Sequence, residues 1–510
     1  MIYALTEETA RRAEARATAE LGMTLADLMR RAGLAVAQEV GRRVPFGDVA
    51  IVAGKGNNGG DGWVAAGELN RQDRQVRVFT PVEPGELAGI AGDAAAEAVD
   101  AGVPFTVLGD EGMGPGDLSE YAAVVDALFG IGFAGPVRQP YVTWIEAIND
   151  SGATIVSVDI PSGVETDTGC TGEHVVRAQV TVTFSSPKVG VLLYPGAEHA
   201  GEVVVADIGV PWEMLGGPGD PEVWQNEDYA ALLPRPAPNV HKNARGRVLV
   251  VAGSGAYPGA AALAAMGAQR AGAGFVTLAV PESIASILQT KLTSAVVVSL
   301  AENPSRTLAS KATHEIVDMA RESDAVVLGP GLTIAHGAVL VSRSLVSELE
   351  KPMVVDADGL NAMIDVANAL EMRSAPTVIT PHPGELARLL DTTPAEIQSD
   401  RLSFGAKLSG PRFACVLKGA RTVTSGRGRQ VVTLSGGPAL ATAGTGDVLA
   451  GMIGTLLAQG LEPLEAGAVA AHLHGLAGDH AARNLTETSV VAEDIPAHLP
   501  HAIREILGQE

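Results

Sequence analysis

Five consecutive residues near the C-terminus, 443–447 (AGTGD), have the types and spacing of a phosphate-binding turn. They lead into a long apolar segment, 447–457, which predicts a helix whose first amides and positive dipole end would face the turn. Gly444 and Gly446 would let the backbone approach phosphate oxygens, and Asp447 could remove a proton from an attacking hydroxyl. A capped turn without a ligand is the simpler interpretation of these five residues taken alone.

Three further segments place polar residues or glycines at predicted strand ends in the same half of the chain. They are TPHPGE with His382, LKGART with Lys418, and LGPGL with Gly331. Because open parallel sheets bind ligands at the carboxyl ends of their strands, these residues are expected to converge on one site. A lone histidine is often structural, but the other two segments at predicted strand ends favour a functional interpretation of His382.

A second glycine-rich segment, GKGNNGGDG, lies between a predicted strand and a predicted helix in the N-terminal half. Gly54, Gly56 and Gly59 match the GxGxxG pattern of a dinucleotide-binding turn. Asn58 and Asp61 argue against that interpretation, because a carboxylate at the start of the helix would oppose an anion. The alternative is a capped turn with Asp61 as the helix N-cap.

Oxygen-bearing side chains also end the next two predicted strands of this half. Asp126 ends AVVD, and Asp159 and Ser162 belong to VDIPSG. Carboxylate, amide and hydroxyl oxygens are hard ligands that suit an alkali or alkaline-earth cation. Such a cation would also attract an anionic ligand to the turn that contains Asn58.

Elements that could position these residues alternate along the chain as short β-rich runs and helical segments. This is the pattern of α/β domains with mostly parallel sheets, and 510 residues are too many for one core. Dense Pro and Gly between residues 210 and 240 predict a linker. We therefore expect domains at 1–215 and 239–510, joined by a linker at 216–238.

Composition narrows the possible partners. The 36 basic and 59 acidic residues give a net charge of −23, which disfavours nucleic acid and anionic membrane surfaces. Cys170 and Cys415 are the two cysteines, and neither has metal-ligand spacing, so neither a disulfide framework nor a zinc site is expected. A cytoplasmic location is expected, because the chain shows no targeting segment and no long apolar run.

The N-terminal half resembles the epimerase domain of the bifunctional NAD(P)H-hydrate repair enzymes. Four motifs in residues 48–211 carry the resemblance: GKGNNGGDG, VDALFGIG, VDIPSGVETDTG and TFSSPKVGVLLYPGAEHAGEVVVADIGVP. It implies a Rossmann-like three-layer αβα domain that interconverts the R and S forms of NADHX and NADPHX. Glu165 stands where the family usually has Asp, which lies outside the implied ligands.

The resemblance also implies two residue sets for this half. The substrate would contact two loops and one aspartate: Asn57, Asn58, Gly59, Gly60, Asp61, Gly130, Ile131, Gly132, Phe133, Ala134, Gly135, Pro136 and Asp159. Potassium would be held by Asn58, Asp126 and Ser162. Asp159 is our hypothesis for the group that moves the proton of the C6 hydroxyl, with Lys188 as a weaker candidate.

The C-terminal half resembles the ADP- or ATP-dependent NAD(P)H-hydrate dehydratases, which have a ribokinase-like αβα fold. The motifs span residues 241–457: HKNARGRVLVVAGSGAYPGAAALAAMGAQRAGAGFVTLAV, LGPGL, VVDADGLNAM, ITPHPGEL, LKGARTV and AGTGD. Ala443 replaces a usual glycine, and Asn243-Ala244 separates His241-Lys242 from the next glycine.

This second resemblance implies a reaction and its residues. Asp447 would activate the C6 hydroxyl, ADP or ATP would phosphorylate it, and loss of phosphate would restore NAD(P)H, with magnesium bridging the nucleotide phosphates. The hydrated substrate would contact Ala260, Gly331, His382 and Asp447. The nucleotide would contact Lys418, Gly419, Ala420, Arg421, Thr422, Gly444, Thr445 and Gly446.

Three alternatives remain at this point. The C-terminal half could be a kinase for a hydroxymethylpyrimidine or thiazole alcohol, which would leave a stable phosphoester. The N-terminal half could serve an NAD-dependent dehydrogenase, with Glu83 on the ribose, or be a binding module without catalysis. A homo-oligomer is expected in each case.

Overall fold

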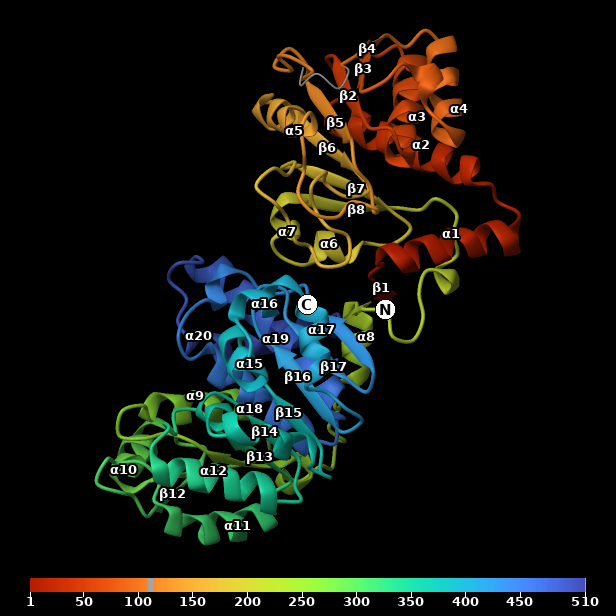
Figure 1. The fold of residues 1–510 in the computed structure, drawn as a ribbon. Coiled ribbons are helices and arrows are strands. Elements are labelled where there is room, and N and C mark those ends of the chain that lie inside the picture. Colours follow the sequence, from red (N-terminus) through yellow and green to blue (C-terminus); the bar gives the residue numbers. More distant parts are fainter. Residues whose placement is uncertain (109–113, 510) are drawn as a thin grey trace. The chain divides into compact units, whose positions relative to one another are not determined.

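The computed structural model describes residues 1–108 and 114–509, and the chain divides into two compact units (Figure 1). The N-terminal unit is Ile2–Pro221, and the C-terminal unit is Glu222–Glu510. Part of the expected linker, 216–238, is regular structure: it contains strand β9 (Glu222–Val223) and helix α8 (Asn226–Leu232). Glu222 of β9 pairs with Val431 of the second sheet, so this part of the Pro- and Gly-rich segment belongs to that sheet.

The N-terminal unit is built on one parallel sheet of seven strands. Their order across the sheet is β4 (Phe105–Val107), β3 (Val76–Thr80), β2 (Val49–Ala53), β5 (Ala123–Ala127), β6 (Thr154–Val158), β7 (Val180–Phe184) and β8 (Glu202–Ala206). All neighbouring strands are parallel. Parallel strands need crossover connections, so helices must cover both faces.

Helices cover this sheet on both faces, which confirms the three-layer expectation for the unit (Figure 1). Alternate residues of β2 enter different cores: Val49 and Ile51 join one, and Ala50 and Val52 join the other. The helices are α1 (Glu7–Leu21), α2 (Leu25–Arg43), α3 (Asn57–Arg71), α4 (Gly89–Asp100), α5 (Tyr141–Asp150), α6 (Val189–Leu192) and α7 (Gly196–His199). The first four pack on one face and α5 on the other.

The C-terminal unit has a larger, mixed sheet. Its strands run in the order β9, β18 (Arg429–Val432), β17 (Val423–Gly426), β16 (Phe413–Leu417), β15 (Thr377–Ile379), β14 (Met353–Val355), β13 (Ala325–Leu328), β10 (Arg247–Val251), β11 (Phe275–Pro281) and β12 (Val296–Leu300). Strand β17 is antiparallel to both of its neighbours. The other pairs in this unit are parallel.

Helices again lie on both faces of this sheet. Val248 and Val250 of β10 pack into one core, and Leu249 and Val251 into the other. The first core includes α9 (Pro258–Arg270), α10 (Glu282–Lys291), α18 (Thr445–Ala458), α19 (Pro463–Leu485) and α20 (Asp494–Ile506). The second includes α11 (Thr313–Arg321), α12 (His336–Glu348), α13 (Asp358–Asn361), α14 (Asn368–Glu371), α15 (Pro383–Leu390), α16 (Pro394–Ser399) and α17 (Arg401–Lys407).

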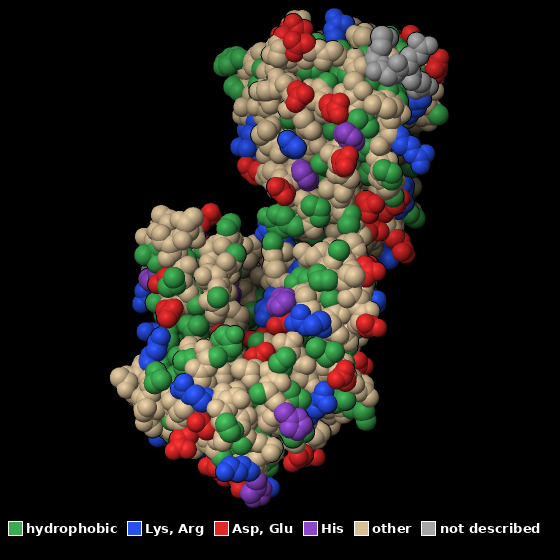
Figure 2. All heavy atoms as spheres, turned by 60° about the vertical axis from the view of Figure 1, so that its left-hand side comes forward, with side chains coloured by type: hydrophobic (Ala, Val, Ile, Leu, Met, Phe, Trp, Pro, Cys, Tyr) green, Lys and Arg blue, Asp and Glu red, His purple; other side chains and the backbone are tan. Residues whose placement is uncertain are grey.

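Charged side chains of both signs are spread over the face seen in Figure 2 instead of forming one large patch. No helix in the described part of the chain is long and apolar enough to cross a membrane.

Candidate functional site

The turn after β2 is shaped by contacts of the backbone with itself. A Cβ at Gly59 would lie 2.0 Å from the carbonyl oxygen of Gly54, and a Cβ at Gly54 would lie 2.1 Å from that of Leu128. Helix α3 begins at Asn57 with Gly56 as its N-cap. The alternative with Asp61 as the N-cap is therefore wrong, because the chain is already helical four residues earlier.

The three predicted potassium ligands lie together around the backbone of Phe129. The Asn58 amide donates to the Phe129 carbonyl at 3.0 Å, and the Phe129 amide donates to the Ser162 hydroxyl at 2.9 Å. That hydroxyl donates to the Asp126 carboxylate at 2.6 Å. The structure thus brings together residues from the ends of β2, β5 and β6 at one edge of the sheet.

The environment of Asp126 suits a monovalent cation. Its carboxylate is 0% exposed, and burial raises its pKa although four hydrogen bonds from Ser157, Ser162 and Leu128 act in the opposite direction. Within residues 1–108 and 114–509, no basic side chain forms an ion pair with it. A cation beside Asp126, Asn58 and Ser162 would supply the missing charge through oxygen ligands.

The glycine loop 130–136 packs against the same turn. A Cβ at Gly130 would lie 3.2 Å from the Asn58 Cβ. Thr166 donates to the Ile131 carbonyl at 2.9 Å, and the Gly135 amide donates to the Glu165 carboxylate at 3.1 Å. Glu165, which departs from the family pattern, therefore holds the loop, and its longer side chain still reaches the backbone.

Asp159 and Lys188 form a buried ion pair beside this loop. Asp159 has a left-handed backbone with a φ of 64°, and its carboxylate accepts hydrogen bonds from the Lys188 ammonium and from the Thr183 hydroxyl and Phe184 amide, both at 3.1 Å. Lys188 is only 3% exposed. Both residues line a pocket that also contains Ile131 of the glycine loop. The pair that sequence reasoning proposed for proton transfer thus faces one cavity.

Asp61 is another buried acid near the ion pair of Asp159 and Lys188. Burial raises its pKa well above the usual value, and the negative charges of Asp159 and Glu14 add to the effect. Lys188 opposes the shift. This shift favours the neutral carboxyl of Asp61, which can donate a hydrogen bond and does not repel an anion as a carboxylate would.

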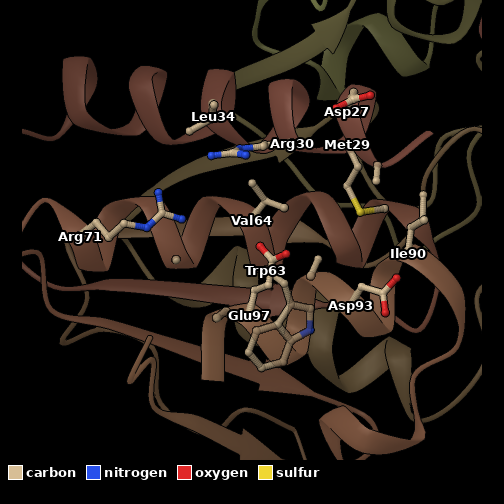
Figure 3. Close-up of a pocket in the computed structure, with 14 residues that line it drawn as sticks. Asp27, Met29, Arg30, Leu34, Trp63, Val64, Arg71, Ile90, Asp93 and Glu97 are labelled. Atoms are coloured by element: carbon tan, nitrogen blue, oxygen red, sulfur yellow. The ribbon is translucent and has the colours of Figure 1, made fainter. Parts of the chain in front are cut away.

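A separate pocket lies among α2, α3 and α4, on the helical face of the same unit (Figure 3). Arg30, Trp63 and Asp93 are among its lining residues, and the described lining includes no residue predicted for the site. We therefore place the candidate site at the strand ends and not in this pocket.

The AGTGD turn of the C-terminal unit begins helix α18, as predicted. Gly444 is its N-cap, with a left-handed φ of 96° that favours glycine. The Thr445 hydroxyl donates to the Leu440 carbonyl at 3.0 Å, and the His474 ring donates to the Thr445 carbonyl at 2.9 Å. Burial lowers the pKa of His474 to about 4, so this helix start is held by a neutral histidine.

Lys418 lies over the first turn of α18. A Cβ at Gly446 would lie 3.3 Å from the Lys418 ammonium, so the absent side chain leaves room for the cation. The ammonium donates to Asp356 at 2.8 Å and lies 3.9 Å from Glu385. Burial alone would lower the pKa of Lys418, but these two carboxylates outweigh it and raise the pKa. A positive charge is thus fixed beside the unpaired amides of the turn.

Asp356 and Glu385 were missed as functional residues by sequence reasoning. Asp356 follows β14 and is 1% exposed, and it also accepts a 2.7 Å hydrogen bond from Thr380. Glu385 is the last residue of TPHPGE, the segment in which only His382 was predicted as a site residue. The available signal for Asp356 was its position directly after β14, whereas Glu385 lies farther from a strand end, in the first turn of α15.

Asp447 shares this cluster. Burial raises its pKa to about 7, and the negative charges of Asp356, Asp358 and Glu385 add to the shift, while Lys418 opposes it. A carboxylate with a pKa near 7 is suited to general base catalysis at neutral pH, because it is basic and still substantially ionised.

This shift predicts the pH dependence of any reaction in which Asp447 takes up a proton. The ionised form is the active one, so kcat should fall as the pH decreases through about 7 and reach a plateau above it. The check is a kcat profile between pH 5.5 and 9 with saturating substrates. An acid limb centred near pH 4, the ordinary range of aspartate, would contradict the shift.

The other residues predicted for this site occupy the surrounding strand ends. A Cβ at Gly331, whose φ is 65°, would lie 2.8 Å from the Ala260 Cβ, so these two residues are neighbours. His382 caps α15: its Nδ1 accepts from the Gly384 amide at 3.0 Å. Burial lowers the pKa of His382. A neutral His382 would therefore carry its proton on Nε2, which lies 3.5 Å from the Glu385 carboxylate.

The turn that follows Lys418 has an irregular backbone. Gly419 has a φ of 141°, and the Thr422 hydroxyl donates to the Gly419 carbonyl at 3.1 Å. Arg421 has a left-handed φ of 59° and donates to the Leu434 carbonyl. Ala420 lies between them in the turn. These residues are placed by the same strand end as Lys418.

Two family models match this chain, one in each unit. A family model described as NAD(P)H-hydrate dehydratase matches residues 248–501, and one described as YjeF-related protein N-terminus matches residues 25–190. The bifunctional NAD(P)H-hydrate repair enzyme of Moorella thermoacetica is 39% identical over 94% of this chain and 92% of its own length. The enzyme of that description from Thermofilum pendens is 39% identical over 90% and 87%.

Among solved structures, the ADP/ATP-dependent NAD(P)H-hydrate dehydratase of Bacillus subtilis, co-crystallised with ATP and Mg²⁺, is 27% identical. The match covers 56% of this chain and 98% of that one, with a TM-score of 0.48.

Proposed function

The chain belongs to the family of bifunctional NAD(P)H-hydrate repair enzymes, and from this premise we propose how its two units divide the work. The unit Ile2–Pro221 epimerises the R and S forms of NADHX and NADPHX. The unit Glu222–Glu510 dehydrates the S form to NADH or NADPH, using ADP or ATP. The observation that supports this division is that the two matched segments, 25–190 and 248–501, fall in different compact units, each with a polar site at its strand ends.

In the N-terminal unit, the two loops would bind the substrate. We propose that residues 57–61 and 130–136 contact the dinucleotide, and that the Asp159 carboxylate removes the proton of the C6 hydroxyl. Asn58, Asp126 and Ser162 would hold potassium, which supplies positive charge for the substrate phosphates. Lys188 and the Phe184 amide stabilise the Asp159 carboxylate between turnovers.

In the C-terminal unit, the residues around α18 would carry out phosphoryl transfer. Asp447 takes the proton of the C6 hydroxyl as its oxygen attacks the terminal phosphorus of ADP or ATP. Lys418 and the amide of Gly446 bind the transferring phosphoryl group, and the rest of residues 418–422 and 444–446 hold the nucleotide. Phosphate then leaves C6 with its bonding electron pair, and loss of a proton from C5 forms the C5–C6 double bond of the reduced ring. Ala260, Gly331 and His382 would bind the hydrated dinucleotide.

Magnesium would enter with the nucleotide, bound to its phosphates. Among the described residues, no group of three or more His, Cys, Asp or Glu side chains is arranged to hold a metal ion. Magnesium is commonly held by substrate phosphates with few protein carboxylates, and it would neutralise the phosphate charge here.

The test of this function is recovery of NADH from an R/S mixture of NADHX. With ADP or ATP and potassium, we expect complete recovery, measured by the absorbance of the reduced ring. When tetramethylammonium replaces potassium, the S form should still disappear quickly while the R form reacts only at its spontaneous rate. A stable phosphoester product would instead identify a kinase, and potassium-independent conversion of the R form would contradict the cation site.

The proposal extends to a homo-oligomeric state for the full chain. Sedimentation velocity of the purified protein measures it directly.

A further inference from the structure

The pocket beside Asp159 and Lys188 contains a carboxyl that the function above does not use, that of Glu14. The lining of the pocket includes residues from α1, the glycine loop and the segments after β6 and β7. Its polar side chains are those of Glu14, Asp159, Ser185 and Lys188.

Helix α1 is fixed in place as one wall of this site. The Thr6 hydroxyl caps its start by accepting from the Thr9 amide at 3.2 Å, and the Glu7 amide donates to Asp167 at 2.7 Å. A Cβ at Gly132 of the glycine loop would lie 3.1 Å from the Arg11 guanidinium, so the helix and the loop are in contact. This contact brings a residue of α1 to the loop that would bind the substrate.

Glu14 lies on the buried side of α1. Ala10, Ala13 and Ala17 are buried, and at helical spacing Glu14 shares their side of the helix. The Ser185 hydroxyl, which also lines the pocket, is buried and has no hydrogen-bond partner in the described part of the chain. The pocket therefore offers both a carboxyl and an unused hydroxyl to a ligand.

The charges around Glu14 favour its neutral form. Burial raises the pKa of Glu14, and the charge of Asp159 raises it further, while Lys188 and Arg11 lower it by less. The charge of Glu14 in turn raises the pKa of Asp61 on α3. Asp159, in contrast, accepts three hydrogen bonds, one of them from an ammonium. A carboxyl of raised pKa beside a carboxylate that is ion-paired with Lys188 is an arrangement suited to an acid and a base.

Epimerisation at C6 needs both an acid and a base. The carbon bears a hydroxyl and the ring nitrogen N1, so removal of the hydroxyl proton allows a C6–O double bond to form while the C6–N1 bond breaks. The electron pair of that bond goes to N1, which must take up a proton. Rotation about C5–C6 and attack of N1 on the other face of the aldehyde reverse every step, and no further reactant is consumed.

We propose that Glu14 is a catalytic acid of the epimerase site, which protonates N1 as Asp159 takes the proton of the C6 hydroxyl. The inference rests on the proposed placement of the substrate between the glycine loop and Asp159. On ring closure, N1 returns its proton to Glu14, and Asp159 returns its proton to the aldehyde oxygen. Both groups thus end in the protonation states in which they began.

The test compares Glu14→Gln with Glu14→Asp and with Glu8→Gln, which changes an exposed carboxyl on the same helix. With an R/S mixture of NADHX, ADP and potassium, the fast phase reports the dehydratase and the slow phase reports conversion of R to S. We expect Glu14→Gln to slow the second phase by ~10²-fold or more. Glu14→Asp should recover part of the loss, and Glu8→Gln should match the unsubstituted protein.

The pH profile separates an acid from a structural residue. In the unsubstituted protein, the slow phase should weaken as the pH rises through the pKa of Glu14, because the neutral acid is lost; in Glu14→Gln this alkaline limb should be absent. A retained limb, or an unchanged slow phase, would overturn the role of Glu14. A loss accompanied by a lower melting temperature of the N-terminal unit would do the same. If Asp159→Asn also leaves the slow phase unchanged, the proposed site itself is wrong.

Discussion

Replacing Asp447 with Asn is expected to lower dehydratase turnover by ~10²–10⁴-fold, the usual contribution of a general base. Asparagine keeps the shape of the side chain but cannot accept the hydroxyl proton. Its neutral amide also ends the repulsion by Asp356, Asp358 and Glu385 that raises the pKa of Asp447. The cluster around Lys418 is therefore expected to be stabilised, and the loss should appear in kcat and not in folding.

Binding of the nucleotide separates this loss from damage to the site. Lys418 and the amides at the start of α18 are unchanged in Asp447→Asn, so the Kd for ADP, measured by calorimetry, should stay within a few-fold. The matched control is Asp318→Asn, which alters a half-exposed carboxyl on α11 of the same unit and should leave turnover unchanged. Near-normal turnover of the Asp447 variant would remove it from the role of base.

The convergence of the site residues could be predicted because it follows from parallel strands. Asp126 lies near the end of β5, and Asp159, His382 and Lys418 follow β6, β15 and β16. The carboxyl ends of parallel strands lie at one edge of their sheet, so the residues of each unit converge at the edge of its own sheet. The sequence also predicted helix α18, because an apolar run follows the turn that contains Gly444 and Gly446. In both units the local pattern and the tertiary arrangement agree.

The residues that were missed depend on which strands become neighbours. Asp356 and Lys418 are 62 residues apart, and they pair because β15 alone separates β14 from β16. The periodicity of apolar residues along the chain does not predict the order of the strands across a sheet. Glu14 has no local signal either, because an acid in a charged helix such as EETARRAEARATAE resembles its solvated neighbours.

The sequence did not predict the short strand β9, for a different reason. Strand β9 follows GGPGDP, and residues around it were expected to form a linker. Its two residues are stabilised by pairing with β18 and not by their own propensity. The Arg429 guanidinium also donates to the Glu222 carboxylate at 2.8 Å, which fixes this strand from the side.

Replacing Asp159 with Asn is expected to reduce conversion of the R form to its spontaneous rate. The measurement is the slow phase with an R/S mixture of NADHX, while the fast dehydratase phase should persist. The substitution has a second consequence, because Lys188 would keep its charge in a site where it is 3% exposed. Breaking a buried ion pair from one side costs about 3–5 kcal/mol, so the N-terminal unit should also lose stability.

A double substitution distinguishes the lost base from the lost stability. Asp159→Asn together with Lys188→Met removes both charges, so the unpaired ammonium and its desolvation cost are gone, and thermal unfolding of the N-terminal unit should return toward that of the unsubstituted protein. Epimerisation should remain at the spontaneous rate, because stability is restored without a group that accepts the hydroxyl proton. Recovery of fast epimerisation in the double variant would mean that Asp159 only neutralises Lys188, and that the proton carrier lies elsewhere in the pocket.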